Sequence, residues 1–405
     1  MTNIQNENFL KILSSALIKS KYKLTSPDWD SLVDAAKRHK VVPIFYSAVY
    51  SDDGFKNSVP KQIIAKMNQN TFLAYGLLSQ RDEFFMSVYQ EMINAGAKPV
   101  LLKGLICRDS YGDMGQYRPS GDEDIYIKQA DFNKCKDILL KNEFVTEYVN
   151  VSKEELRDLQ EITFVNEKEQ FSVELHVNLM STTKDVYNKM NAVFNKSIES
   201  SRWYELDDGT KVISFEPTDN FLYIFFHFYK HFITSGVGIR QLIDIIMFGR
   251  KYIDQINWKK VDQVSKNLSV SKLLGDICFI AQKYFNVRFP IDVKAAQPDL
   301  LIDDLMQTGV FGTKDQLYEL SSYMSVSAAD KSNSGLFRAI LPTFKTLRER
   351  YPVLYKCPFL LPLIYLHRWI KVIKRELKYH KKGSVIVGSL KVGKRRSNLI
   401  KMYDK

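Results

Sequence analysis

Apolar residues recur at spacings of three and four along the first 97 residues, and this period predicts helices. The first predicted helix has its apolar side between Phe9 and Leu17. Ser26 is a candidate N-cap of the second helix, with Pro27 at its first position, and Pro60 begins a longer helical pattern. We therefore predict an N-terminal helical region over residues 1–97.

The pattern changes at residue 98, where short apolar runs of strand length begin. We predict strands at these positions: 99–102, 122–127, 144–149, 162–166, 171–177, 203–206 and 211–215. Helical patterns lie between some of them, at 105–111 and 130–142. Residues 98–215 are therefore predicted to form an α/β core, in a chain of the α+β class.

From residue 216 the helical period returns. Helices are predicted at 217–230, 238–249, 258–266 and 271–284, which gives a C-terminal helical region over residues 216–350. The last region, 351–405, is predicted to contain one basic amphipathic helix at 358–382 and a flexible tail from Gly383 onward.

The predicted helix at 358–382 combines one apolar stripe with many basic residues. The stripe consists of residues three and four apart: Leu363, Leu366, Ile370, Ile373 and Leu377. A basic amphipathic helix of this kind can lie on an anionic membrane. The same stripe can instead pack on the helices of its own protein, so both interpretations stay open for residues 362–405.

The formal net charge of +12 is concentrated in the tail. Residues 367–405 hold nine Lys and four Arg against Glu376 and Asp404, so the rest of the chain is nearly neutral. A nucleic-acid-binding domain carries basic residues across a folded face. The charge distribution therefore argues against nucleic acid as a partner.

Three further features bear on where the protein works. No apolar run approaches the roughly 18 residues of a membrane-spanning helix. The N-terminus lacks the basic and apolar regions of a signal peptide, and the four cysteines have no metal-ligand spacing. We expect a cytoplasmic protein, with contact of the tail at the inner face of the membrane as an open addition.

Two aspartates begin the strand predicted at 122–127. Asp122 and Asp124 are two residues apart, so both carboxylates project from one face of the strand. Paired carboxylates suit Mg²⁺, although a solvated strand edge carries such a pair equally well. Glu174 and His176 share one face of a later strand, where a structural salt bridge is the alternative to a chemical role.

Short motifs follow one another around these residues. In chain order they are the following: AKRHKVVP at 36–43, Leu101-Leu102-Lys103-Gly104, Tyr111, Arg118-Pro119, Asp122-x-Asp124, Glu174-x-His176, His227-Phe-Tyr-Lys-His231 and Arg240-Gln-Leu-Ile-Asp244. Their order and spacing resemble the nucleotidyltransferase superfamily typified by DNA polymerase beta. More narrowly, they resemble the bacterial family of uncharacterised nucleotidyltransferases, over roughly residues 5–290.

The resemblance implies a polymerase-beta-like mixed sheet flanked by N- and C-terminal helices. It also implies transfer of NMP from an NTP to a hydroxyl acceptor, with Asp122, Asp124 and Glu174 holding Mg²⁺ or, alternatively, Mn²⁺. The residues expected to bind substrate are the following: Lys103, Gly104, Arg118, Gly121, His176, His227, His231 and Arg240. The alternative is a catalytically inactive relative that binds nucleotide, or a partner at a membrane surface.

Two positions need a separate interpretation. Lys103-Gly104 stands where the superfamily usually has Gly-Ser, so we expect Lys103 to replace the serine hydroxyl as a phosphate ligand. His227 and His231 are four residues apart and face the same side of a helix. They are expected either to face the cleft or to pack against Arg240 or Asp244, since a third zinc ligand is missing nearby.

Overall fold

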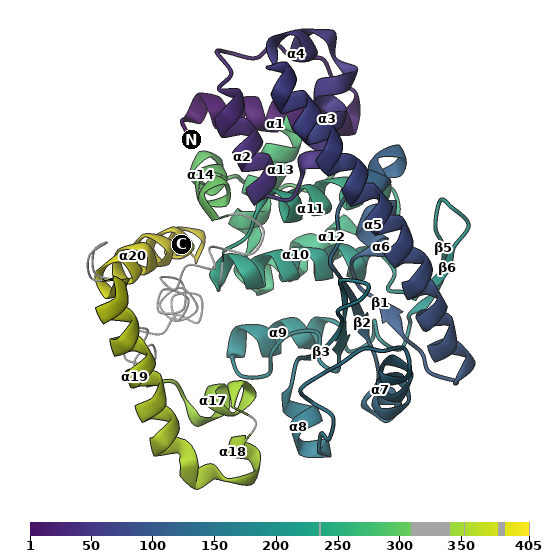
Figure 1. Cartoon of the computed structure of the whole chain (residues 1–405), viewed down its shortest axis with the longest axis vertical. Helices are drawn as coiled ribbons and strands as arrows, with labels where there is room; N and C mark the ends of the chain where they lie inside the picture. Colours follow the sequence, from purple (N-terminus) through teal and green to yellow (C-terminus); the bar gives the residue numbers. More distant parts are fainter. Residues whose placement is uncertain (235, 309–340, 352, 380–384, 405) are drawn as a thin grey trace.

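The computed structural model describes residues 1–404 except 235, 309–340, 352 and 380–384 (Figure 1). Its centre is a mixed sheet of six strands in the order β3-β4-β2-β1-β6-β5. The strands are β1 (Val100–Leu101), β2 (Asp122–Tyr126), β3 (Glu161–Asn166), β4 (Phe171–His176), β5 (Arg202–Glu205) and β6 (Lys211–Ser214). The predicted α+β class is confirmed.

The sheet combines both strand directions. β2 pairs in parallel with β4, and β1 in parallel with β6. The pairs β1–β2, β3–β4 and β5–β6 are antiparallel. The strand predicted at 144–149 is wrong, because Val145 makes only an isolated bridge to Val165.

Five helices precede the sheet, in the region that the sequence predicted to be helical. They are α1 (Asn3–Ile18), α2 (Trp29–Arg38), α3 (Val42–Ser51), α4 (Asp53–Ser58) and α5 (Lys61–Asn94). The N-cap of α2 is Asp28, whose side chain accepts from the backbone N–H of Ser31, so the prediction of Ser26 is wrong. Ser26 has a φ of +42° and turns the chain two residues earlier.

Shorter helices connect the strands. They are α6 (Leu105–Asp109), η1 (Gly112–Tyr117), η2 (Gln129–Asp131), α7 (Phe132–Lys141), α8 (Lys153–Asp158) and α9 (Asp185–Val193). The helices after the sheet are α10 (Pro217–Ile233), α11 (Ile239–Lys251), α12 (Trp258–Asn267), α13 (Ser271–Phe285) and α14 (Pro298–Thr308). The tail contains α17 (Phe344–Arg350), α18 (Val353–Lys356), η3 (Pro358–Leu360), α19 (Leu361–Tyr379) and α20 (Val385–Asp404).

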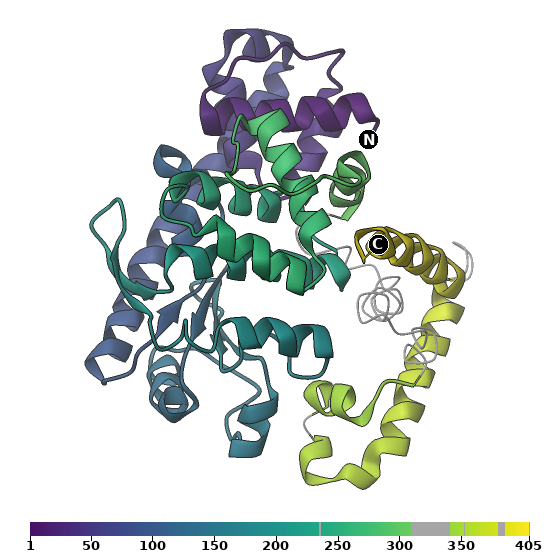
Figure 2. The same cartoon turned by 180° about the vertical axis from the view of Figure 1, so that it is seen from behind.

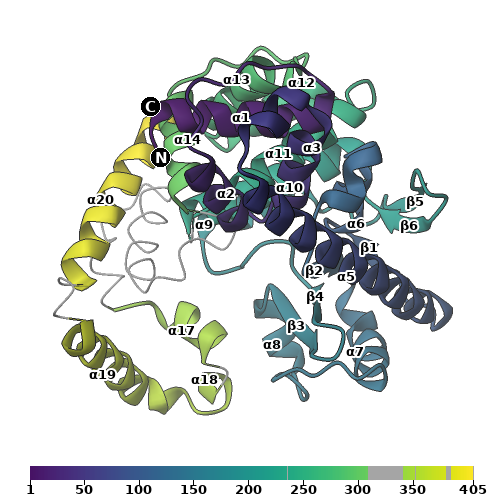
Figure 3. The same ribbon diagram turned by 45° about the horizontal axis from the view of Figure 1, so that its top comes forward.

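The two helical groups lie together at one end of the molecule, and the sheet lies toward the other (Figures 1 and 2). The long helix α5 runs from the N-terminal group along the sheet, which Figure 3 shows most clearly. One buried apolar cluster extends through all three parts, from Phe9 through Phe85 and Leu175 to Phe226. The predicted boundaries near residues 97 and 215 therefore mark changes of secondary structure within a shared core, and the division into domains stays a prediction.

The C-terminal segment differs from the predicted flexible tail. Residues 385–404 form α20, and Leu399, Ile400 and Tyr403 near its end are buried in the main core. The Tyr403 hydroxyl donates to Asp276 Oδ2 at 2.7 Å. Glycines in this stretch suggested flexibility, but the apolar residues spaced three and four apart provide a face that packs on α13.

A second, smaller apolar cluster holds the tail helices to one another. Leu347, Leu354 and Ile364 are its buried members. In Figure 1, α17, α18 and α19 stand apart from the sheet. Among the described helices, none combines the length and the apolar character needed to cross a membrane.

Candidate active site

The parallel pairing of β2 and β4 brings the predicted acidic residues together. Asp124 stands opposite Glu174, and Asp122 stands opposite Ser172. Because side chains alternate along a strand, Asp122, Asp124 and Glu174 project from the same face of the sheet. All three line one cavity of about 220 Å³.

The cavity lies between the sheet and the helices α10 and α11. The described residues that line it are Lys103, Gly104, Arg118, Ser120, Asp122, Asp124, Glu161, Glu174, His227, Lys230, His231, Arg240, Gln241 and Asp244. Nine of the eleven predicted site residues are among them. The other two, Gly121 and His176, lie outside this described lining: His176 is fully buried beside Asp124, and the Gly121 carbonyl accepts from the Ser172 N–H.

Asp124 is the most constrained of the carboxylates. Its Oδ2 is 2.9 Å from Lys103 Nζ, and its Oδ1 is 3.0 Å from His176 Nε2. Burial alone would raise the pKa of Asp124, but the charge of Lys103 and the hydrogen bond with His176 hold the pKa well below its usual range. Asp124 is therefore ionised although its side chain is buried.

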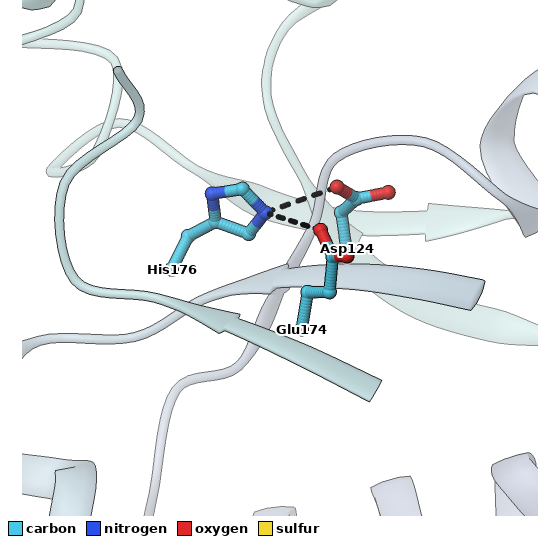
Figure 4. A group of neighbouring side chains, drawn as sticks. All are labelled: Asp124, Glu174 and His176. Carbon is cyan, nitrogen blue, oxygen red and sulfur yellow. Dashed lines mark hydrogen bonds and ion pairs between the residues drawn. The ribbon is translucent and has the colours of Figure 1, made fainter. Parts of the chain in front are cut away.

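His176 lies among three acidic side chains. Its Nε2 is 3.7 Å from Glu174 Oε2 as well as 3.0 Å from Asp124, as Figure 4 shows, and its Nδ1 is 3.5 Å from Glu161 Oε2. Burial alone would lower the pKa of His176, but the hydrogen bond with Asp124 and the charge of Glu161 raise it to about 9. Glu174 differs from Asp124: burial has the largest effect on its carboxyl group, and the pKa of Glu174 is raised.

One group of side chains has the geometry for a metal ion. Single ligand atoms of Asp124, Glu174 and His176 all lie within 4.8 Å of one another. Asp122 lines the same cavity but lies outside this group. The described residues therefore offer a set of two carboxylates and one imidazole, where the sequence led us to expect three carboxylates.

His227 and His231 face the cavity, so the cleft-facing alternative describes their position. His227 Nε2 is 3.0 Å from Lys103 Nζ and 2.9 Å from His231 Nε2. Burial and the nearby charge of Lys103 lower the pKa of His227 well below its usual value. Burial also lowers the pKa of His231, to about 3, so both rings are neutral near pH 7.

The family comparison agrees with this geometry. The model of a family described as uncharacterised nucleotidyltransferases matches residues 25–286, more than half of the chain. The chain belongs to this family. No curated protein and no solved structure matches it.

All cavity-lining residues, from Lys103 to Asp244, fall within the span that matches this nucleotidyltransferase family. The resemblance drawn from the motifs is therefore confirmed at the level of the family. The helices from α14 to α20 lie beyond the matched span.

Packing within the chain itself requires glycine at position 104. Its φ is +59°, and a Cβ atom there would lie 1.7 Å from Glu123 Oε2. Glu123 is buried on the opposite face of β2, where it accepts from the Leu105 N–H at 2.9 Å and pairs with Arg108. Burial raises the pKa of Glu123 to about 8. The close approach that requires glycine is thus to a carboxylate of the chain itself.

The guanidinium group of Arg118 is buried and, within the described part of the chain, has two paired nitrogen atoms and one unpaired nitrogen atom. Its Nε and Nη2 donate to Asp244 at 2.7 and 2.9 Å, whereas its buried Nη1 has no hydrogen-bond partner among the described residues. Arg240 donates to the Pro119 carbonyl at 2.8 Å and also lines the cavity. Both guanidinium groups therefore bring positive charge to the end of the cavity near Asp122.

Five of the described lining residues were missing from the predicted site: Ser120, Glu161, Lys230, Gln241 and Asp244. Glu161 and Lys230 form the ion pair among them that lies beside His176. Glu161 begins β3 and stands opposite His176 in the β3–β4 pair. Lys230 on α10 lies 3.6 Å from Glu161 Oε2. Lys230 sits between His227 and His231 in a quoted motif, which was a usable signal, but nothing in the sequence pattern indicated that β3 would add a fourth carboxylate.

Proposed function

We propose that this cavity is the active site of a metal-dependent nucleotidyltransferase that moves NMP from an NTP to a hydroxyl acceptor. The observation that carries the proposal is the placement of Asp124 opposite Glu174 on parallel strands, at the floor of a cavity within the family match. A purely structural role would not need several carboxylates turned toward one cavity, because buried like charges repel one another.

Asp122, Asp124 and Glu174 would hold Mg²⁺, or alternatively Mn²⁺, with the triphosphate completing the coordination. The fit is supported by ionised Asp124 and by the short separations between Asp124, Glu174 and His176. Bound there, a divalent cation neutralises charge on the phosphoryl oxygens and lowers the pKa of a coordinated hydroxyl.

The cations around the cavity would bind the triphosphate. Lys103 contributes a compact ammonium group beside Asp124, and Arg118 has its Nη1 available for a phosphate oxygen. Arg240 lies at the same end, and His227 and His231 contribute neutral nitrogen atoms beside Lys103. Glu174, which remains partly open to the cavity, is placed to accept the proton of the acceptor hydroxyl.

The test uses the full-length protein with Mg²⁺ and each labelled NTP in turn. Release of pyrophosphate and transfer of label to an added acceptor fraction are followed together. We expect both signals in the wild-type protein and their loss in Asp124→Asn, because a neutral amide binds a hard cation poorly. Glu174→Gln should also lose activity, whereas Glu205→Gln is the matched control, since Glu205 is an exposed strand residue outside the cavity.

The inactive alternative makes a different prediction in the same assay. An inactive relative would bind labelled NTP in equilibrium dialysis and release no pyrophosphate with any acceptor fraction. Pyrophosphate release at the wild-type rate by the double variant Asp122→Asn, Asp124→Asn would place the chemistry elsewhere in the protein.

The proposed function includes contact between residues 362–405 and an anionic membrane. The supporting observation is that Leu363, Leu366 and Ile370 on α19 are 60%, 56% and 42% exposed, while Ile364 on the other side packs into the small tail cluster. These three members of the stripe are therefore open to solvent, which supports contact with a membrane. Residues 341–379 carry nine Lys and Arg against two Glu, which is complementary to anionic lipid.

A further inference from the structure

We propose that His176 is a nitrogen ligand of the cation site and that Glu161 holds its ring in position from behind. The inference rests on the metal-dependent transfer proposed above, but it concerns which atoms bind the cation. Asp124 and Glu174 supply the oxygen ligands of the same site. His176 thereby adds an imidazole nitrogen to the carboxylate ligands proposed above.

The Nε2 atom of His176 points at the two carboxylates. It lies 3.0 Å from Asp124 Oδ1 and 3.7 Å from Glu174 Oε2, and the three side chains converge in Figure 4. Two ligands at right angles, each about 2.1 Å from a small divalent cation, are about 3 Å apart. The three atoms therefore already have nearly the separations that ligands of one ion require.

Glu161 occupies the other edge of the imidazole ring. Its Oε2 is 3.5 Å from the buried His176 Nδ1, which has no hydrogen-bond partner among the described residues, so Glu161 is the carboxylate placed to accept from it. Gln160 Nε2 donates to the same oxygen at 2.6 Å. Lys230 Nζ, 3.6 Å away, supplies a counter-charge. Histidines that bind metals typically donate their second ring N–H to a carboxylate, which fixes the ring and its tautomer. Glu161 is thus a positioning residue that acts through His176.

A nitrogen ligand changes the metal preference of the site. Mg²⁺ prefers oxygen ligands, whereas imidazole favours transition metals, and affinity rises from Mn²⁺ to Co²⁺ at a given site. The protein without nucleotide should therefore bind Co²⁺ more tightly than Mn²⁺, and both more tightly than Mg²⁺. An all-carboxylate site would show a much smaller difference.

The decisive measurement is pulsed EPR of full-length protein loaded with Mn²⁺ in the absence of nucleotide. We expect modulation from a directly bound nitrogen, and a change in that modulation when histidine is labelled with ¹⁵N. His176→Gln should remove the nitrogen signal. His231→Gln is the matched control, because His231 lines the same cavity and should leave the signal unchanged.

Glu161→Gln tests the positioning role separately. We expect the affinity for Mn²⁺, measured by titration calorimetry, to fall about 10-fold to 100-fold, as for other residues that orient metal ligands. Glu205→Gln, also on a strand, should leave the affinity unchanged. Glu161→Asp, which keeps the charge but shortens the side chain, should recover part of the loss.

Each outcome separates this inference from the proposed transfer reaction. A Mn²⁺ spectrum with oxygen ligands alone, or no Mn²⁺ binding to the free protein, overturns the inference and leaves pyrophosphate release to decide the reaction. Nitrogen ligation without any transfer keeps the ligand assignment and removes the proposed function. Circular dichroism shows whether His176→Gln folds. If it does not, His227→Gln and His231→Gln are compared instead. A nitrogen signal that persists in both variants assigns the ligand to His176, and loss of the signal in either variant overturns the assignment.

Discussion

A buried, bidentate ion pair between Arg118 and Asp244 joins the segment before β2 to the middle of α11, with Arg118 four residues ahead of the strand. Arg118 Nε and Nη2 lie 2.7 and 2.9 Å from the two Asp244 oxygens, and the Tyr111 hydroxyl donates to Asp244 Oδ1 at 2.7 Å. Removing one partner leaves the other charge buried without compensation, which costs about 3–5 kcal/mol. We expect Asp244→Ala to lower the free energy of unfolding by this amount in urea denaturation.

A surface ion pair provides the control for Asp244→Ala. Asp34 pairs with Lys37 at 3.1 Å on the exposed side of α2. Exposed pairs contribute about 0–1 kcal/mol, so Asp34→Ala should change the free energy of unfolding by no more than this. Equal effects of the two substitutions would contradict the structural importance of the Arg118–Asp244 pair.

The pair also shows why part of the site was beyond sequence reasoning. Arg118 was expected to bind phosphate, and its motif was recognised, but Asp244 is 126 residues away and two of the donors of Arg118 turn toward it. Strand periodicity alone predicts that Asp122 and Asp124 share one face of their strand, and that Glu174 and His176 share one face of theirs. The closeness of His176 to Asp124 depends on the register of β2 and β4, which the pattern within each strand does not specify.

Gly104 permits a prediction about backbone geometry. A Cβ atom there would collide with Glu123 Oε2 at 1.7 Å, in addition to the strain of a φ of +59°. Strain of that kind alone costs about 1–3 kcal/mol. We expect Gly104→Ala to lower the free energy of unfolding by more than this, because Glu123 must also leave the Leu105 N–H and Arg108.

Gly112 allows the cost of the positive φ to be measured separately from the cost of the collision with Glu123. Its φ is +56°, and no described atom lies within 4 Å of its Cβ position. Gly112→Ala should therefore show the cost of the backbone conformation alone in the same denaturation experiment. If Gly104→Ala were no more destabilising than Gly112→Ala, contact with Glu123 would not be the reason for glycine at this position.

The buried imidazole of His39 should make the free energy of unfolding depend on pH. It is fully buried at the end of α2, its Nδ1 accepts from the Ile239 N–H at 3.3 Å, and burial lowers its pKa to about 3. The unfolded chain, with a pKa of about 6.5, binds the proton more readily, so this stabilisation is complete above about pH 6.5. It is lost progressively as the pH falls toward the folded value, by about 2 kcal/mol at pH 5.

The measurement compares wild type with His39→Gln in urea at pH 7.5 and pH 5. The wild-type protein should lose about 2 kcal/mol more than the variant between these values, since the variant has no ring to protonate. Other buried histidines contribute equally to both proteins and cancel. A difference that is the same at both pH values would mean that His39 binds a proton equally well in the folded and the unfolded protein.

The hydrogen-bond partner of His39 was beyond sequence reasoning. The helical region at 1–97 was predictable because its apolar residues keep a helical period, whereas the contact with Ile239 joins segments 200 residues apart. Contacts between distant segments also explain why α20 was not predicted as a helix. Its glycines and lysines gave the pattern of a flexible tail, and only the buried positions of Ile400 and Tyr403 make the helix stable.

Lys103 should act mainly on substrate binding. Its Nζ lies between Asp124 Oδ2 at 2.9 Å and His227 Nε2 at 3.0 Å, at the floor of the cavity. In the proposed reaction it neutralises phosphate charge, so Lys103→Met should raise the KM for NTP by about tenfold or more, which corresponds to about 1.4 kcal/mol of lost binding. The control is Lys211→Met, since Lys211 is exposed at the start of β6. A lower kcat with unchanged KM would instead assign Lys103 to the chemical step.

The last prediction concerns α19 and anionic lipid. Full-length protein should co-sediment with vesicles that contain phosphatidylglycerol and not with neutral phosphatidylcholine vesicles. Binding should weaken as salt is raised from 0.1 to 1 M, because the screening length falls from about 10 to about 3 Å. The double variant Leu363→Glu, Ile370→Glu should bind at least about tenfold more weakly, since it places charge on the exposed apolar stripe.

A truncation would not test this helix cleanly, because α20 buries Ile400 and Tyr403 in the main core. The double variant Phe72→Glu, Leu73→Glu is the better comparison, since Phe72 and Leu73 are 76% and 55% exposed on α5, far from the tail in the sequence. It adds the same two negative charges to exposed apolar residues and should leave vesicle binding intact. Equal loss in both variants would indicate a general effect of net charge, and binding unaffected by salt or by the double variant would exclude α19 as the lipid-contacting element.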